Sequence, residues 1–133
     1  MNDFGVFRVL QQALARDEYL SEKITMVVTE KRPGLGFPFI QAKFLDLCLD
    51  IPCLVQNALL KCEIHIFSDY HGDMEIHEIM SRLNFVLDGV SWPVHVDAMN
   101  KAGKAMFKLH GQQMHLTGGI REGVLSYQVK VSV

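Results

Sequence analysis

The sequence predicts an α+β fold: a mostly antiparallel β-sheet with an N-terminal helix and a second helix packed on one side. Two observations carry most of this prediction. Residues 74–87 hold apolar side chains at helical spacing, whereas residues 57–68 and 124–133 alternate apolar and polar side chains as half-buried strands do. A chain of 133 residues also has the length of one domain with one core, so we expect residues 1–133 to form a single domain.

The first element expected is an amphipathic helix that ends near Asp17. Asn2 or Asp3 can cap its start, because short polar side chains accept hydrogen bonds from the first free backbone N–H groups. Its apolar side chains are Phe4, Val6, Phe7, Val9, Leu10, Ala13 and Leu14. This stripe is wide, so we expect the sheet or a neighbouring chain to cover much of the helix.

A strand is expected next, over residues 23–29, because the run KITMVVT is rich in β-branched side chains. The segment EKRPGLGFPFI follows, and its prolines and glycines predict a loop. Phe37 and Phe39 are unusual in such a loop. Either they are exposed anchors for a partner, or they fold back onto the core.

The middle of the chain predicts two more strands. Residues 39–49 alternate imperfectly, and a bulge near Phe44 and Leu45 would explain why the apolar side chains change sides. Residues 51–56 suggest a turn around Pro52. Residues 57–68 predict a central strand in which Cys62, Ile64 and Ile66 point one way and Glu63, His65 and Phe67 the other.

The last third predicts a helix and a series of strands. The helix over residues 74–87 begins after turn residues and stops at Gly89. Strands are expected at residues 90–98, 106–110 and 113–116, and a hairpin turn at Arg121-Glu122-Gly123. In the final strand the alternation assigns Leu125, Tyr127, Val129, Val131 and Val133 to the core face.

Bulk composition argues against several functional classes. The net charge is −2, which disfavours a protein whose main work is wrapping phosphates but leaves room for a local basic patch. Cys48, Cys53 and Cys62 are an odd number without a tight pair, so we expect reduced thiols that behave as buried apolar groups. The first residues lack the pattern of a signal peptide, and no segment has the length of a membrane span.

Three histidines, His65, His71 and His77, gather around the start of the second helix. His77-Glu78 begins like the zinc motif H-E-x-x-H, but Ser81 stands where the second histidine would be. We therefore expect His71 and His77 to be surface residues around the start of the helix. The chain also has no G-x-S-x-G elbow and no phosphate-binding glycine loop. We predict a protein that is not an enzyme, with no catalytic, metal or cofactor site.

Four basic residues, Lys31, Arg32, Lys101 and Lys104, allow two interpretations. They could contact an acidic partner or nucleic acid, or they could be part of an ordinary solvated surface. The sequence favours the solvated surface, because the four are scattered along the chain.

In the order of its segments the chain resembles the tail completion proteins of long-tailed bacteriophages, the tail terminator and head-to-tail joining family. The resemblance rests on the N-terminal helix FGVFRVLQQALARDEYL with a following loop ending in PF, on CEIHIFSDYHGDMEIHEIMSRLNFVLDG, and on the closing hairpin LTGGIREGVLSYQVKVSV. It covers the whole chain. Phe67 stands where the family often has tryptophan, and the turn IREG holds fewer charges than the usual form.

The resemblance implies a structural protein of the virion tail, assembled in the bacterial host cytoplasm. Such proteins form a ring, commonly of about six copies, at the head-proximal end of the tail tube. The implied partners are further copies of the chain, the tail tube protein and the head connector or stopper protein. DNA would pass through the lumen without specific binding, and no membrane is involved.

A ring needs repeated contacts between unlike surfaces of neighbouring copies. The candidate residues for contact with a subunit or partner are Lys31, Arg32, Phe37, Phe39, Arg121, Glu122 and Tyr127. Two alternatives remain at this point. One is a small oligomeric adaptor or binding module without catalysis, and the other is an enzyme with a site around His65, His71 and His77.

Overall fold

A computed structural model describes residues 5–46, 57–96 and 101–132. The described residues form three helices, α1 (Val6–Arg16), α2 (Glu18–Lys23) and α3 (Met74–Leu87), and six strands, β1 (Val27–Val28), β2 (Phe39–Asp46), β3 (Asn57–Ser68), β4 (Ser91–Val96), β5 (Lys101–Thr117) and β6 (Ile120–Ser132). The strands make one sheet in the order β1-β2-β3-β6-β5-β4. All neighbours are antiparallel except β1 and β2. The predicted α+β class is confirmed.

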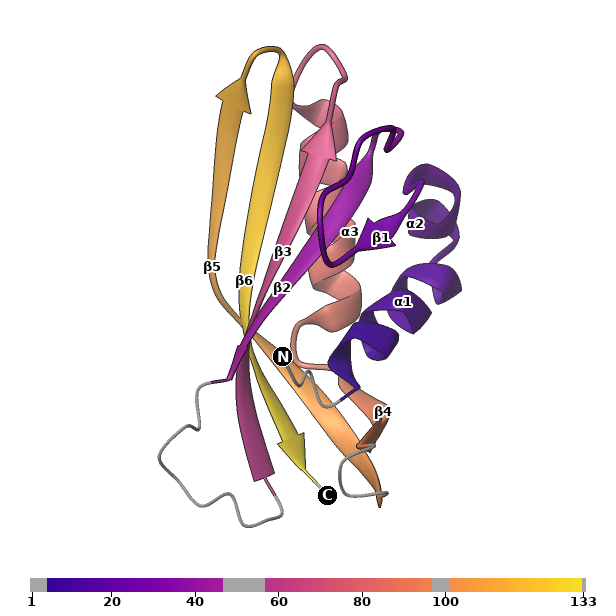
Figure 1. Ribbon diagram of the computed structural model, residues 1–133, viewed down its shortest axis with the longest axis vertical. Helices are drawn as coiled ribbons and strands as arrows, with labels where there is room; N and C mark the ends of the chain where they lie inside the picture. Colours follow the sequence, from indigo (N-terminus) through magenta and orange to yellow (C-terminus); the bar gives the residue numbers. More distant parts are fainter. Residues whose placement is uncertain (1–4, 47–56, 97–100, 133) are drawn as a thin grey trace.

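The three helices lie on one side of the sheet (Figure 1). α3 follows the central strands β3 and β6 on this side, and α1 reaches β4. The buried side chains of α3 are Ile76, Ile79, Met80, Leu83 and Leu87, which confirms the predicted stripe. They meet the inner side chains of β3 and β6, including Ile64, Ile66, Leu125 and Tyr127. Each such burial stabilises the fold by roughly 1.5–3 kcal/mol.

α1 ends at Arg16, next to the predicted end at Asp17, but a second helix begins at once. Asp17 accepts a hydrogen bond from the backbone N–H of Leu20 at 3.0 Å and so caps α2. Its other carboxylate oxygen pairs with Nε of Arg82 on α3 at 2.7 Å. The strand predicted over residues 23–29 is wrong for its first half: Lys23 belongs to α2, residues 24–26 belong to no helix or strand, and only Val27–Val28 form a strand. The predicted caps Asn2 and Asp3 lie outside the described residues.

β2 pairs with β3 in continuous register from Phe39 to Asp46, so the bulge predicted near Phe44 and Leu45 is wrong. Ile40, Ala42 and Phe44 face the core, whereas Leu45 lies on the other face and is 52% exposed. Within residues 39–46 the change in the apolar pattern thus reflects an exposed leucine, and the pairing with β3 contains no bulge. Leu47, Leu49 and the predicted turn at residues 51–56 lie outside the described residues.

β5 and β6 form a long hairpin closed by Gly118 and Gly119, whose φ angles are 58° and 82°. Two residues with positive φ are what a tight hairpin turn needs. Arg121-Glu122-Gly123, predicted as the turn, is instead part of β6 and pairs with residues 114–116. The two strands predicted at residues 106–110 and 113–116 are one strand, with a register shift between Leu109 and Gly111.

Candidate assembly surface

The loop between β1 and β2 folds back onto the sheet and covers an aromatic cluster on the face opposite the helices. Phe39 is only 6% exposed and stacks on Phe67 with ring centroids 4.8 Å apart. Phe37 joins them, with its centroid 5.4 Å from that of Phe39, and Lys31 Nζ sits 4.0 Å from the centroid of Phe67. Of the two alternatives for these phenylalanines, the structure favours folding back.

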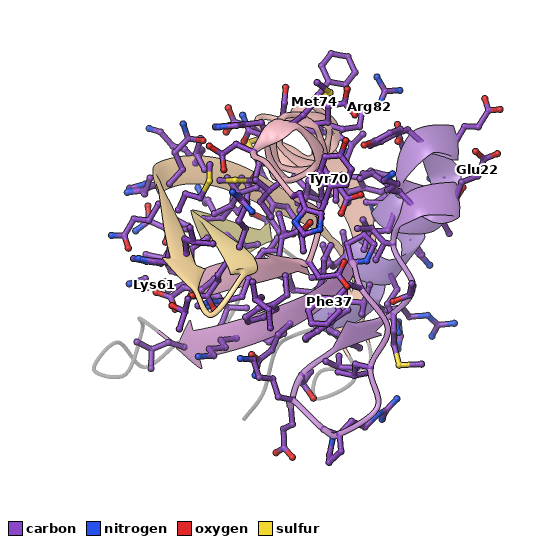
Figure 2. The ribbon with its side chains drawn as sticks, turned by 90° about the horizontal axis from the view of Figure 1, so that it is seen from above. Glu22, Phe37, Lys61, Tyr70, Met74 and Arg82 are labelled. Atoms are coloured by element: carbon purple, nitrogen blue, oxygen red, sulfur yellow. The ribbon has the colours of Figure 1, made fainter. Side chains whose placement is uncertain are left out.

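Above this cluster the surface is hollowed by an open pocket of about 550 Å³. Its lining includes Lys31, Arg32, Leu35, Phe37, Ile120 and Glu122, which brings the basic loop next to the β5–β6 turn. Five of the seven residues predicted as an interface, Lys31, Arg32, Phe37, Phe39 and Glu122, therefore meet at one end of the sheet. Figure 2 shows Phe37 beside this loop, on the side of the molecule away from α3.

Glu122 belongs to a short polar network that crosses the outer face. His65 Nδ1 lies 3.3 Å from Glu122, and His65 Nε2 lies 3.3 Å from Glu63. Lys61 Nζ approaches Glu63 at 3.4 Å. Partial burial raises the pKa of Glu63, but hydrogen bonds to His65 and Lys61 and their charges outweigh burial and leave the pKa below its ordinary value. Both carboxylates thus have polar partners within the protein.

Arg121 points to the other face of the sheet from Glu122. Its Nε donates to Asp73 at 2.6 Å and its Nη1 to the carbonyl oxygen of Tyr70 at 3.0 Å. These bonds attach the β5–β6 hairpin to the start of α3. Arg121 is therefore not part of the surface formed by Glu122 and the loop.

Tyr127, another candidate contact residue, lies in the core and is 1% exposed. Its hydroxyl donates to Asn84 Oδ1 at 2.8 Å, and its ring meets Phe107 edge-on at 5.7 Å. The predicted core face of the last strand is confirmed for Leu125, Tyr127, Val129 and Val131, whereas Val133 lies outside the described residues.

Burial raises the pKa of the Tyr127 phenol above its ordinary value, and Asp88 and Cys62 add to the shift. Burial and the hydrogen bond to Glu78 raise the pKa of Tyr19 to about 12. In the unfolded chain both phenols lose protons near pH 10. Above that pH the folded chain holds more protons than the unfolded one. The two phenols should therefore leave the free energy of unfolding unchanged below about pH 9 and lower it as the pH rises beyond 10.

The variant Tyr127→Phe tests this dependence. It should lower the free energy of unfolding by about 1 kcal/mol at pH 7, because the hydrogen bond to Asn84 is lost. Its stability should then fall less than that of the wild type between pH 9 and 11, as measured by urea denaturation. Parallel curves for the two proteins would show that Tyr127 does not titrate differently on folding.

His71 and His77 are exposed at the start of α3, as the sequence predicts. Among the described residues, no three histidine, cysteine, aspartate or glutamate side chains converge closely enough to hold a metal ion. Cys62 is fully buried in the core, which confirms the predicted burial, whereas Cys48 and Cys53 lie outside the described residues. No helix in the described ranges has the length and apolar character needed to cross a membrane.

Both ends of the sheet leave strand edges open. β4 pairs with β5 only as far as Met106, so no described strand pairs with that side of residues 110–117. Figure 1 shows this upper part of the hairpin extending well beyond β4. Thr117 and Ile120 close the two-residue turn as a hydrogen-bonded pair. In an antiparallel hairpin the backbone N–H and C=O groups of every second residue point away from the partner strand. The backbone groups of Gln112, Met114 and Leu116 therefore point away from β6.

At the other end, β1 pairs with β2 only at Ile40 and Gln41. The edge of β2 beyond Gln41 has no further strand partner among the described residues. An open strand edge is a ready template for a strand from another chain. These edges could not be located from the sequence, because the strand order that creates them depends on long-range pairing.

Several exposed apolar side chains also went unnoticed in the sequence. Leu116 is 62% exposed on the open edge, and Phe85 and Met74 are 73% and 68% exposed on the outer side of α3. Phe85 and Met74 lie outside the regular apolar stripe of α3. That deviation was the one sequence signal that could have identified them.

No protein-family model matches the sequence, and no curated protein matches it. Among solved structures, the fold matches a chain of the "Virion of native gene transfer agent (GTA) particle" with a TM-score of 0.70. The match covers 93% of this chain and 92% of that chain, at 15% sequence identity. The two chains share one fold. At this identity the likeness concerns the fold alone.

Proposed function

We propose that this chain is a structural subunit of a phage or phage-like tail, a tail terminator or head-to-tail joining protein that forms a ring at the head-proximal end of the tail tube. The observation that carries the proposal is the match in fold, over nearly the full length of both chains, to a chain of a gene transfer agent virion. The partners are other copies of the chain, the tail tube protein and a head connector or stopper protein.

The two open sheet ends support a ring. The edge of β5 at Gln112, Met114 and Leu116 is unlike the edge of β2 beyond Gln41. A contact between these unlike edges is heterologous, so it repeats from copy to copy and closes when the rotation between copies is suitable. The pocket between the Lys31–Phe39 loop and the β5–β6 turn lies at one end of the same sheet, where a neighbouring virion protein can dock.

Light scattering of the purified protein, with and without its tail tube protein, tests the proposal. We expect a particle of about six copies of the 15.1 kDa chain, formed alone or on addition of tube protein. A fixed dimer that ignores the tube protein would contradict the ring and favour a small adaptor.

The variant Leu116→Pro tests the role of the β5 edge. Proline removes only the outward-pointing N–H of Leu116, so the β5–β6 pairing should survive while pairing with another copy is lost. We expect a monomeric mass for Leu116→Pro. Leu116→Ser is the matched control, because it removes the same apolar side chain but keeps the N–H. If both variants assemble like the wild type, this edge is not an interface between copies.

A further inference from the structure

The face of the sheet that the described helices leave uncovered carries a concentration of lysines that the composition hides. The chain has 13 basic and 15 acidic residues, yet five lysines share this face. They are Lys43 on β2, Lys61 on β3, Lys104 and Lys108 on β5, and Lys130 on β6. All five are exposed. Figure 2 shows Lys61 far from Glu22 and the α2 side of the molecule.

The strand register places these lysines close to one another. Lys61 and Lys108 flank Gln128 in one row across β3, β6 and β5, and Lys130 lies in the next row opposite Met106. Strands lie about 4.8 Å apart and diagonal neighbours about 7–8 Å apart, so adjacent lysines of the group are separated by roughly 7–10 Å at their Cα atoms. Lys104 continues the series along β5.

Few negative charges oppose this group. Among the described side chains, the sheet residues on this face include two carboxylates, Glu63 and Glu122. Glu63 pairs with Lys61 at 3.4 Å, and Glu122 lies 3.3 Å from the His65 ring, so five lysines share the face with two carboxylates. No described carboxylate forms an ion pair with Lys43, Lys104, Lys108 or Lys130. The face therefore presents positive charge to its surroundings although the whole chain is slightly acidic.

The chemistry of the face indicates which polyanion fits it. Lysines are flexible point charges, which suit contacts with phosphate oxygens and carry no sequence information. Single-stranded nucleic acid is usually held by exposed aromatic rings on which bases stack. Phe39 and Phe67, the aromatic residues of β2 and β3 on this face, are 6% and 5% exposed. The described strands thus offer no exposed phenylalanine, tyrosine or tryptophan on this face, which favours a duplex.

We propose that this lysine face contacts the phosphate backbone of double-stranded DNA without sequence preference, through Lys61, Lys104, Lys108 and Lys130 with Lys43 at its border. The inference goes beyond the proposed function, because a ring can form whatever charge this face carries. It also stands apart from the four basic residues singled out in the sequence, of which only Lys104 belongs to the group.

Fluorescence anisotropy with a labelled 30-base-pair duplex of arbitrary sequence tests the proposal. The wild type should bind at about 50 mM salt and weaken steeply as salt rises, because each phosphate contact contributes about 0.9 to the slope of log K against log salt. The variant K61Q/K104Q/K108Q/K130Q should reduce that slope by about 3–4. All four side chains are exposed, so the fold should survive, and circular dichroism checks that it does.

A matched pair of double variants separates location from total charge. K108Q/K130Q removes two charges from the lysine face, and R8Q/K23Q removes two from the helical side. K108Q/K130Q should lose most of two phosphate contacts, so its slope of log K against log salt should fall by about 2. R8Q/K23Q should bind the duplex like the wild type.

Three outcomes would overturn the proposal. One is a wild type that does not bind duplex at low salt, and another is an equal loss of binding in both double variants. The third is a variant of the lysine face that still binds duplex but has a changed mass in light scattering. The lysines would then contact an acidic surface of another copy of the chain. A failure of ring formation is seen separately, in the mass of the wild type, and leaves the duplex measurement interpretable.

Discussion

Replacing Phe107 by alanine is expected to lower the free energy of unfolding by about 3–5 kcal/mol, the range found for large aromatic residues in well-packed cores. Phe107 is fully buried on the helix-facing side of β5. Its ring packs edge-on against Tyr127, and its carbonyl oxygen accepts the N–H of Gly89 just after α3. The residue thus joins the sheet to the end of α3, and its loss would leave a cavity at that junction.

Met106→Ala is the control for this prediction. Met106 is the neighbour of Phe107 on the same strand, but it faces the uncovered side of the sheet and is 48% exposed. Its truncation should change stability by less than about 0.5 kcal/mol, because a surface change removes little buried contact. Urea denaturation at pH 7 measures both variants. Similar losses for the two would show that the helices do not cover the face that Phe107 occupies.

The parts of the fold that local pattern predicts are those in which one face is buried and the other is wet. Residues 57–68 alternate strictly enough to place Cys62, Ile64 and Ile66 in the core, and α3 has both the spacing and the bounds that its apolar stripe predicts. In these elements local preference and tertiary burial agree, so the period of the pattern is sufficient.

The errors arise where one side chain or turn outweighs the local pattern. Asp17 caps α2 and pairs with Arg82, a residue 65 positions away, and the helix that begins there takes in Lys23, the first residue of a predicted strand. Gly118 and Gly119 form the tight turn, so Arg121 and Glu122, which were predicted as the turn, belong to a strand. Neither the ion pair nor the choice between two neighbouring turn signals is encoded in hydrophobic periodicity.

The candidate surface was predicted only in part, for a similar reason. The residues of the Lys31–Phe39 loop that were predicted to contact a partner gather at one end of the sheet. Tyr127 could not be placed among contact residues or core residues by type alone, and the alternation that assigns it to the core was the better guide. The lysine face could not be predicted from the sequence. Its lysines come from four strands, and only the register of those strands brings them together.

Replacing Gly5 by alanine should lower the free energy of unfolding by about 2–5 kcal/mol. Gly5 precedes α1 with a φ of 83°, where a side chain costs about 1–2 kcal/mol in backbone strain. A Cβ there would lie 2.7 Å from the carbonyl oxygen of His95 and 2.7 Å from Cγ2 of Val94, both on β4. Because one of these atoms belongs to the backbone, relief requires α1 to move away from β4, at a further cost of about 1–3 kcal/mol.

Gly89→Ala separates the two contributions. Gly89 also has a positive φ, of 74°, but no atom lies within 4 Å of the position its Cβ would take. This variant should lose only the strain of about 1–2 kcal/mol. Trp92, the one tryptophan of the chain, lies on β4 with the Arg16 guanidinium of α1 5.4 Å from its ring centroid, so its fluorescence reports whether α1 has moved. A spectral change in Gly5→Ala and none in Gly89→Ala is the expected result. Equal losses of stability with unchanged fluorescence in both would mean that α1 does not approach β4 closely at Gly5.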